Sequence, residues 1–225
     1  MKRVRLFTAI LFTVALATML SSCKKEDDVI VYGNAKFKLV NAVQGSATQD
    51  FYQGDTKINT TALDYGETSD YLTVKAGNST VSFKSATNQM VSASGNIGVN
   101  TDVNYTVFFA KNAIGTNEIT GYPELVATPP AGRAGVRFVN LGGNLTSAIL
   151  VSLATGGPIT TNLNFGAITD YAVLDPSVEH KFSLINTPTI STAIPVGTFQ
   201  AGKLYTVWFD SSNSTTAQYH VVVQN

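Results

Sequence analysis

Cysteine, histidine and charged residues are all scarce in this chain of 225 residues. A single Cys excludes an intramolecular disulfide, and one Cys with two His leaves too few ligands for a cysteine-rich zinc site. Charged residues make up 13%, with 15 Lys+Arg against 15 Asp+Glu, so the chain lacks the basic excess that neutralises nucleic-acid phosphates. We therefore expect no metal, no cofactor and no nucleic-acid partner.

The sequence motifs of common enzymes are missing as well. The chain contains no Gly-x-Ser-x-Gly elbow, no glycine-rich phosphate-binding motif and no His-Glu-x-x-His. His180 and His220 lie on predicted strands in the same half of the chain, and without a third ligand we interpret them as partly exposed strand positions rather than a zinc site. We predict that the protein is not an enzyme, because a hydrolase would need converging catalytic groups that no motif indicates.

The one long apolar run lies at the N-terminus. Residues 1–5 carry three basic side chains, and residues 6–20 are apolar except for three Thr. This order is typical of a signal peptide, and the run is shorter than the roughly 20 apolar residues of a membrane-spanning helix. We assign residues 1–22 to a cleaved signal peptide.

The signal ends in Leu20-Ser21-Ser22-Cys23, which resembles the lipobox of bacterial lipoproteins. The resemblance implies cleavage before Cys23, a thioether-linked diacylglyceryl group on its thiol and acylation of the new N-terminus. More than one acyl chain is what stable membrane anchoring requires. The alternative is an ordinary secretory signal in which Cys23 is incidental.

Charged residues cluster directly after this point, at Lys24, Lys25, Glu26, Asp27 and Asp28. The cluster resembles the surface-export signal of Bacteroidota lipoproteins, which implies an outer-membrane lipoprotein facing the cell exterior. A plain flexible tether at the periplasmic face is the alternative. Removal of residues 1–22 takes away three basic residues, so the remaining 203 residues carry a net charge of −3, and residues 23–34 form the predicted lipidated tether.

The rest of the chain contains two copies of one unit. Three segments recur in the same order, with offsets of 99, 100 and 100 residues. They are AKFKLVN (35–41) and AGVRFVN (134–140), LDYGETSDY (63–71) and LNFGAITDY (163–171), and NYTVFF (104–109) and LYTVWF (204–209). The period indicates a duplicated domain, and the Pro-Pro-Ala-Gly stretch between the copies places domain 1 at 35–127, a linker at 128–133 and domain 2 at 134–225.

Within each copy the apolar residues have the period of a β-strand. Phe37 and Leu39 point one way and Lys36 and Lys38 the other, while the continuous apolar character of the YTV segments suits strands covered on both faces. Turn residues recur about every 8–12 positions, and no helical period is found outside the signal. The sequence predicts an all-β chain with two tandem domains, each an antiparallel sandwich or barrel.

These features together resemble a known family. An opening strand that ends in Val-Asn, a middle apolar-x-aromatic-Gly turn before a Tyr, and a late Tyr-Thr-Val strand are similar to the domain-of-unknown-function family numbered 4397. The resemblance implies tandem immunoglobulin-like sandwiches in bacterial envelope lipoproteins, and it implies no reaction. Copy two departs from the pattern where LDPS (174–177) replaces VKAG (74–77).

Three carboxylates, Asp64, Glu67 and Asp70, lie within seven residues. Such a cluster is able to bind Ca²⁺ or to act as an acid–base pair. Copy two has Asn164, Ala167 and Asp170 at these positions, so it keeps only the last carboxylate. We therefore interpret the cluster as a turn and a strand-entry cap, with Ca²⁺ binding as the open alternative.

Recurring tyrosines indicate shared structure, and unmatched ones are the candidate ligand contacts. Tyr105 and Tyr205 recur at the position of a tyrosine corner, in which the hydroxyl bonds back to the chain. Tyr52 and Tyr122 have no aromatic counterpart in copy two. Each is a candidate for stacking on a sugar or anchoring a protein partner. The alternative is that each is partly buried at a strand edge or at the domain junction.

The sequence favours a non-enzymatic binding or adhesion module, held on the outer membrane through the Cys23 lipid, whose sandwich loops contact a protein or glycan ligand. The alternative is a structural accessory subunit of an outer-membrane protein complex, docked through a sheet edge or the face between the domains.

Overall fold

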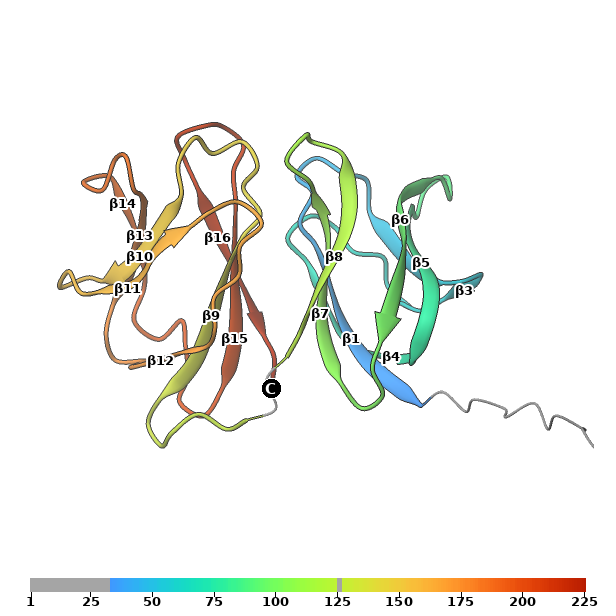
Figure 1. Ribbon diagram of the computed structural model, residues 1–225, viewed down its shortest axis with the longest axis horizontal. Helices are drawn as coiled ribbons and strands as arrows, with labels where there is room; N and C mark the ends of the chain where they lie inside the picture. The colour runs from blue at the N-terminus through green and yellow to red at the C-terminus, as the bar shows by residue number, and fades with distance from the viewer. Residues whose placement is uncertain (1–32, 125–126) are drawn as a thin grey trace, which may run out of the picture. The chain divides into compact units, whose positions relative to one another are not determined.

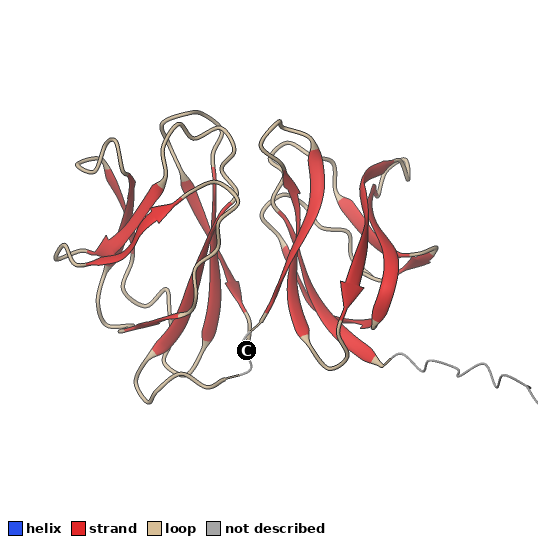
Figure 2. Cartoon of the chain, viewed as in Figure 1, coloured by secondary structure: helices blue, strands red, loops and turns tan. Residues whose placement is uncertain are grey.

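Alternating apolar residues form sixteen strands and no helix in the part of the chain that the computed structural model describes, residues 33–124 and 127–225 (Figure 2). The all-β prediction is confirmed. The predicted signal peptide, Cys23 and the charged residues 24–28 lie outside the described residues. The described strands all belong to one compact unit, Tyr32–Asn225, which is separate from Met1–Val31.

The first eight strands build two four-stranded sheets, ordered β4-β1-β7-β8 and β3-β2-β5-β6 (Figure 1). Their bounds are β1 Asn34–Asn41, β2 Gln49–Gln53, β3 Thr56–Lys57, β4 Thr68–Lys75, β5 Gly77–Ser85, β6 Val91–Val99, β7 Asn104–Lys111 and β8 Asn117–Pro123. A single apolar cluster fills the space between the two sheets, with Phe37, Phe51, Phe83 and Phe109 at its centre. These eight strands therefore form one sandwich, called here sandwich 1.

The last eight strands repeat this arrangement as sandwich 2, with sheets ordered β12-β9-β15-β16 and β11-β10-β13-β14. Their bounds are β9 Ala134–Asn140, β10 Ile149–Leu153, β11 Pro158–Leu163, β12 Ala172–Leu174, β13 His180–Leu184, β14 Ser191–Ile194, β15 Leu204–Asp210 and β16 Gln218–Val223. Sandwich 2 has its own core, in which Phe138, Phe182 and Phe209 pack together. Two sandwiches in tandem are thus confirmed.

Strand pairing is antiparallel in both sandwiches with one exception in each. β1 pairs in parallel with β7, and β9 pairs in parallel with β15. A parallel pair requires a long connection, because a hairpin joins only antiparallel strands. Here that connection contains the whole second sheet of each sandwich together with β4 or β12 of the first sheet. The expectation of purely antiparallel sheets is therefore wrong for these two pairs.

The tyrosine corner predicted from the sequence is present in both copies. The backbone N–H of Asn100 donates to the Tyr105 hydroxyl over 3.2 Å, and the N–H of Gln200 donates to the Tyr205 hydroxyl over 2.9 Å. Each bond links the start of the central strand to the loop that precedes it. The recurrence of these tyrosines therefore reflects the fold, as their spacing suggested.

Candidate functional site

The two sandwiches meet at a junction, which positions the loops of the candidate site. Val40, Phe108, Val139 and Trp208 are each 0% exposed and belong to one apolar cluster drawn from both copies. These side chains lie on the faces of β1, β7, β9 and β15 that point away from the sandwich cores. The YTV strands are accordingly covered on both faces, as predicted, and the second cover is the other copy.

Polar contacts across the junction occur in equivalent pairs. Lys38 donates to the Val223 carbonyl, and Arg137, its counterpart in copy two, donates to the Pro123 carbonyl over 2.6 Å. The Lys38 ammonium also lies 4.3 Å from the ring centre of Tyr71, and the Arg137 guanidinium 5.1 Å from that of Tyr171. The two copies thus face each other about an approximate two-fold axis, as the subunits of a symmetric dimer do.

Arg137 is the most buried charge of this junction, at 3% exposed. Its Nε donates to the Thr206 hydroxyl over 2.8 Å, and the Gln224 amide donates to both Thr106 and Thr206. Burial lowers the pKa of the Arg137 guanidinium, while Tyr171 and Glu124 nearby partly offset that effect. The guanidinium stays charged because an arginine side chain is not deprotonated in proteins, so the junction holds a buried cation with protein hydrogen-bond partners.

A second polar group closes the junction at its other end. The Tyr65 hydroxyl from sandwich 1 donates to Asp210 and lies 3.3 Å from His220 Nε2, which is itself 3.3 Å from Asp210. The His220 ring stacks on Trp208 with 3.8 Å between ring centres. Burial, followed by the bond to Asp210, raises the pKa of Tyr65 and keeps it protonated. These contacts hold the loops above them in fixed positions.

Directly above this group lies a cleft of about 350 Å³. Four loops line it, one after each of the strands β1, β7, β9 and β15, so the two copies contribute equivalent loops. The lining residues include Gln44, Lys111, Asn112, Ile114, Asn144 and Ser211. Because it lies between two sandwiches fixed by buried contacts, the cleft is preformed.

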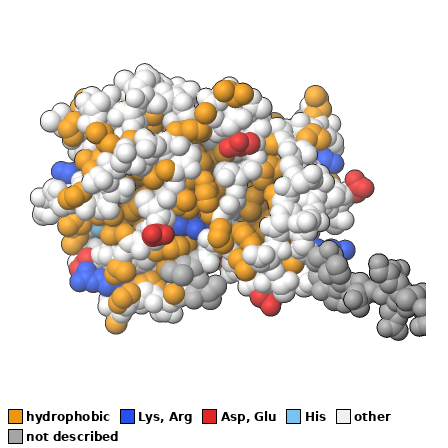
Figure 3. Space-filling view, viewed as in Figure 1, with side chains coloured by type: hydrophobic (Ala, Val, Ile, Leu, Met, Phe, Trp, Pro, Cys, Tyr) orange, Lys and Arg blue, Asp and Glu red, His pale blue; other side chains and the backbone are white. Residues whose placement is uncertain are grey.

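The cleft opens onto a larger surface, called here the loop end. It consists of residues 42–48, 86–90, 112–116, 141–148, 185–190 and 211–217, which backbone bonds and the shared cleft place side by side. None of these six loops contains Asp, Glu, Lys or Arg. Figure 3 shows this composition as mainly white and orange atoms along the top of the view.

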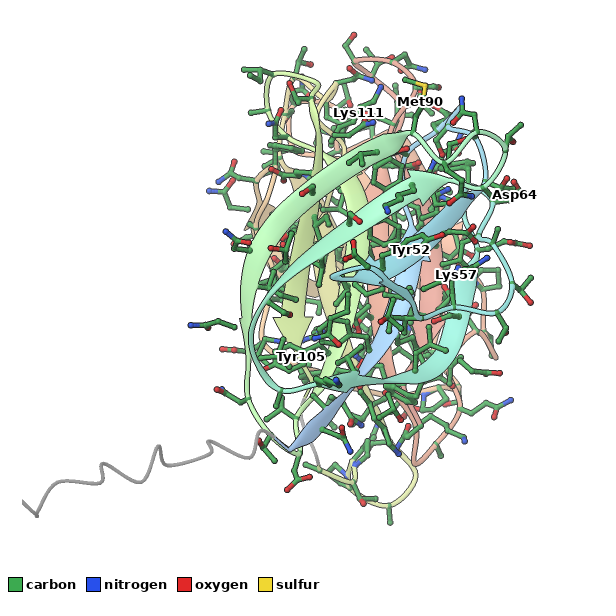
Figure 4. All side chains as sticks on the ribbon, turned by 90° about the vertical axis from the view of Figure 1, so that its right-hand side faces the viewer. Tyr52, Lys57, Asp64, Met90, Tyr105 and Lys111 are labelled. Carbon is green, nitrogen blue, oxygen red and sulfur yellow. The ribbon has the colours of Figure 1, made fainter. Side chains whose placement is uncertain are left out.

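Exposed apolar side chains are concentrated at the loop end. Met90 is 68% exposed, Ile114 86% and Ile190 73%. Figure 4 shows Met90 and Lys111 at this end and Tyr105 near the other. The other end bears charge instead, for example in the Arg133–Asp175 ion pair of 2.5 Å. The chain enters β1 at that charged end, because Asn34 pairs with Lys75 and the loop end begins only after Asn41.

Tyr52, a candidate ligand contact from the sequence, lies on the outer face of sandwich 1 beside Lys57 (Figure 4). The Lys84 ammonium sits 4.1 Å from the centre of its ring, and its hydroxyl donates to Gln89 over 2.8 Å. The buried Asp50 carboxylate beside it is paired with Lys57 at 2.7 Å. Copy two has Ser152 at the position of Tyr52, so the shared fold does not require this cluster.

Tyr122, the other candidate, lies in the junction. Its ring meets Phe108 edge-on at 6.2 Å, and the residue is partly buried against the junction cluster. The structure therefore does not bring Tyr52 and Tyr122 together.

The carboxylates singled out from the sequence form a local turn. The backbone N–H of Asp64 donates to the Glu67 carboxylate over 2.8 Å, and the N–H of Glu67 donates to the Asp64 carbonyl over 3.0 Å. Gly66 between them has a φ of +84°, which favours glycine. Asp70 lies further on, exposed on β4. Within residues 33–124 and 127–225, no three His, Cys, Asp or Glu side chains are grouped for a metal ion.

His180 differs from the sequence expectation of a partly exposed position. It is 1% exposed, packs against Phe199 at 5.8 Å, and its Nε2 has no hydrogen-bond partner in the described part of the chain. Burial lowers its pKa, and Asp175 only partly offsets the effect. His180 is therefore a neutral core residue, and His220 lies apart from it in the junction.

This burial predicts a pH-dependent stability. Because the folded pKa of His180 lies below its unfolded value near 6.5, the unfolded chain takes up the proton first as the pH falls. Stability is then complete above about pH 6.5 and falls, by at most about 1.4 kcal/mol per pH unit, as the pH drops towards the folded pKa. Urea denaturation at neutral and mildly acidic pH measures this slope. His180→Leu should flatten it, and an unchanged slope in that variant would contradict the assignment.

The chain is similar to known proteins at the level of a family model and of solved structures. A model of the family described as "Domain of unknown function (DUF4397)" matches residues 35–147. No curated protein matches the chain. Among solved structures, the chain is similar to one described as the crystal structure of CBMbc (family CBM26) from Eubacterium rectale Amy13K in complex with maltoheptaose. The two chains are 10% identical, with a TM-score of 0.26, and the match covers 85% of this chain and 97% of that chain. No helix within the described residues has the length and apolar character to cross a membrane.

Proposed function

The chain belongs to the DUF4397 family of domains of unknown function, and from that premise we propose that it is a non-enzymatic binding module of the bacterial cell envelope. In this proposal Cys23 carries the lipid anchor, residues 24–28 direct export, and the loop end binds a glycan or protein ligand at the cell surface. The observation that carries the proposal is the preformed cleft, which two copies build together at the end away from Asn34.

The location of the cleft supports a role in recognition. Loops on a rigid sandwich are common places for binding residues, because the sheets hold the loops while leaving their sequences free to vary. β1 is eight residues long, so the loop end lies roughly 25 Å from the point where the chain enters the sandwich. A tether attached at Asn34 therefore leaves the cleft accessible.

The composition of the loop end favours an uncharged ligand. Its six loops carry hydroxyl, amide and apolar side chains and no formal charge, so they offer hydrogen bonds and apolar contacts without attracting ions. Recognition of this kind depends little on ionic strength, since salt screens charge–charge attraction and leaves apolar contacts intact. Neutral oligosaccharides and uncharged protein surfaces both have this chemistry.

Cells that display the lipidated protein are expected to bind an array of neutral oligosaccharides and matrix proteins, with less than about a twofold change between low and high salt. Ile114→Ser removes the exposed apolar side chain at the rim of the cleft without changing any charge and should abolish binding. Val196→Ser is the matched control, because Val196 is also exposed, at 56%, but lies in the β14–β15 loop at the charged end.

The same cells test the anchor and the orientation. Protease added to intact cells should remove the binding, and Cys23→Ser should release the protein from the membrane. Protein that stays intact when protease is added to whole cells would contradict exposure at the cell surface. Binding that needs sulfated or sialylated glycans and disappears in high salt would contradict an uncharged ligand.

A further inference from the structure

One strand, β6, has an edge that the fold leaves unprotected. β6 is the outer strand of the sheet β3-β2-β5-β6 and runs nine residues, VSASGNIGV, without a charge or a proline (Figure 1). An edge strand presents a row of unpaired backbone N–H and C=O groups, and proteins usually block such a row with charge, proline, a short strand or a cover. Of these devices, β6 has no charge or proline, and its one pairing irregularity lies at its start, where Lys84 of β5 pairs with Val91, so the stretch from Ala93 to Val99 is regular.

The other seven edge strands each carry one. β3 has two residues, β12 three and β14 four. β4 contains Asp70 and Lys75, and β8 contains Glu118 and Pro123. β11 begins with Pro158 and pairs irregularly with β10, and β16 contributes Val222 to the buried junction. Among the described strands, β6 is thus the longest edge strand that contains neither a charged residue nor a proline.

The surroundings of β6 leave room for another strand. Gly95, at the middle of β6, pairs with the buried Val81 and so lies on the core-facing side of the sheet, whereas Ser94 and Asn96 on either side of it are exposed. Neighbouring β8 is in the other sheet and makes one printed hydrogen bond to β6, from the Asn117 amide to the Ser92 carbonyl at the loop end. The stretch from Ala93 to Val99 is thus open.

We propose that β6 pairs antiparallel with β6 of a second copy of this chain and joins two sheets into one of eight strands. A two-fold axis through Gly95 relates the two edges, which is the closed symmetry that most homodimers use. In this register Gly95 lies opposite Gly95 and Ser94 opposite Asn96, so no like charges meet across the pair. The strand is thus complementary to itself.

Antiparallel pairing fixes the orientation of the two copies. The Val99 end of β6 lies beside Gly77, close to where the chain enters at Asn34. Because the partner strand runs the opposite way, the two Asn34 ends lie at opposite ends of the joined sheet. This geometry fits molecules held on two facing surfaces, a consequence that rests on the proposed function, whereas the pairing itself does not.

The chain without residues 1–23, which lie outside the described residues, is expected to show a concentration-dependent dimer in sedimentation velocity. The double variant Ser94→Lys/Asn96→Lys should weaken the dimer by about tenfold or more, because it places ammonium groups opposite each other at the exposed positions of the pair. Thermal melts check that the variant folds as the parent does.

Three controls sharpen this test. Ser94→Ala/Asn96→Ala changes the same positions without adding charge and should still dimerise, and Ala193→Lys adds a charge to the short edge strand β14 and should have no effect. A mixture of Ser94→Lys/Asn96→Lys and Ser94→Glu/Asn96→Glu chains should recover the dimer as a mixed pair, which a folding defect cannot explain.

A monomer at every concentration, or a dimer that Ser94→Lys/Asn96→Lys leaves intact, would overturn the proposal. Because the measurement needs neither the lipid nor a ligand of the loop end, its failure is distinguishable from failure of the proposed function.

Discussion

Arg137→Ala is expected to lower the free energy of unfolding by about 3–5 kcal/mol, because it removes two hydrogen bonds from a buried cation, each contributing about 1.5–3 kcal/mol. The guanidinium is 3% exposed and donates to Pro123 of sandwich 1 and to Thr206 of sandwich 2. Its loss leaves Thr206 with Gln224 as a donor, takes the Arg137 donor from the Pro123 carbonyl and opens a space at the junction. Urea denaturation followed by circular dichroism measures the change.

The duplication supplies a matched control for Arg137. Lys38 is its counterpart in copy one and also donates to a carbonyl of the opposite copy, but it is only half-buried. Lys38→Ala should therefore cost about 1 kcal/mol, the net value of a typical hydrogen bond. Arg137→Lys keeps the charge with fewer donors and should lie between the two. Equal small costs for Arg137→Ala and Lys38→Ala would show that the buried network does not hold the junction.

Trp208→Ala is expected to destabilise the fold by about 3–5 kcal/mol as well, for a different reason. The indole is 0% exposed, meets Phe108 edge-on at 6.2 Å and stacks on His220 at 3.8 Å. Its removal leaves a cavity between sandwiches that cannot collapse, because the cores on both sides are already packed. Circular dichroism is the suitable measurement, since Trp208 is the only Trp of the chain.

The control for this variant also comes from the repeat. Copy one has Phe108 at the equivalent position, so Trp208→Phe keeps an aromatic ring that the fold accepts there. We expect it to cost roughly half as much as Trp208→Ala, because a smaller cavity remains. A loss in Trp208→Phe as large as in Trp208→Ala would indicate that the stacking on His220, rather than the filled volume, stabilises the junction.

Both variants connect the junction to the candidate site. The cleft at the loop end is lined by loops of both sandwiches, and Asp210 belongs at once to the cleft lining and to the group with Tyr65 and His220. A weakened junction therefore changes the spacing of the loops. Under the proposed function, ligand binding should decline in Arg137→Ala in proportion to the loss of stability.

Several features of the fold were accessible from the sequence because they depend on local patterns. Phe37 and Leu39 alternate with Lys36 and Lys38, and that period of two predicts a strand with one buried face. The duplication was visible because equivalent segments keep their order and spacing. Tyr105 and Tyr205 bond to backbone groups five residues away, and such short-range contacts follow from position alone.

The candidate site was less accessible. Tyr52 and Tyr122 drew attention because they lack counterparts, yet one pairs with Lys84 on an outer face and the other packs in the junction. The loop end was missed although its signal is present in the sequence, as six loops without charge. That signal has meaning only once the topology shows that these loops lie at the same end.

The sequence by itself determined the β class, the duplication and the predicted lipoprotein signal, because periodicity, repetition and short motifs are properties of neighbouring residues. Only the tertiary structure decided that the outer faces of β1, β7, β9 and β15 meet, since contacts such as that of Lys38 with Val223 join residues 185 positions apart. It also decided that β6 is an edge strand, because strand order depends on pairing energies summed over the whole sheet.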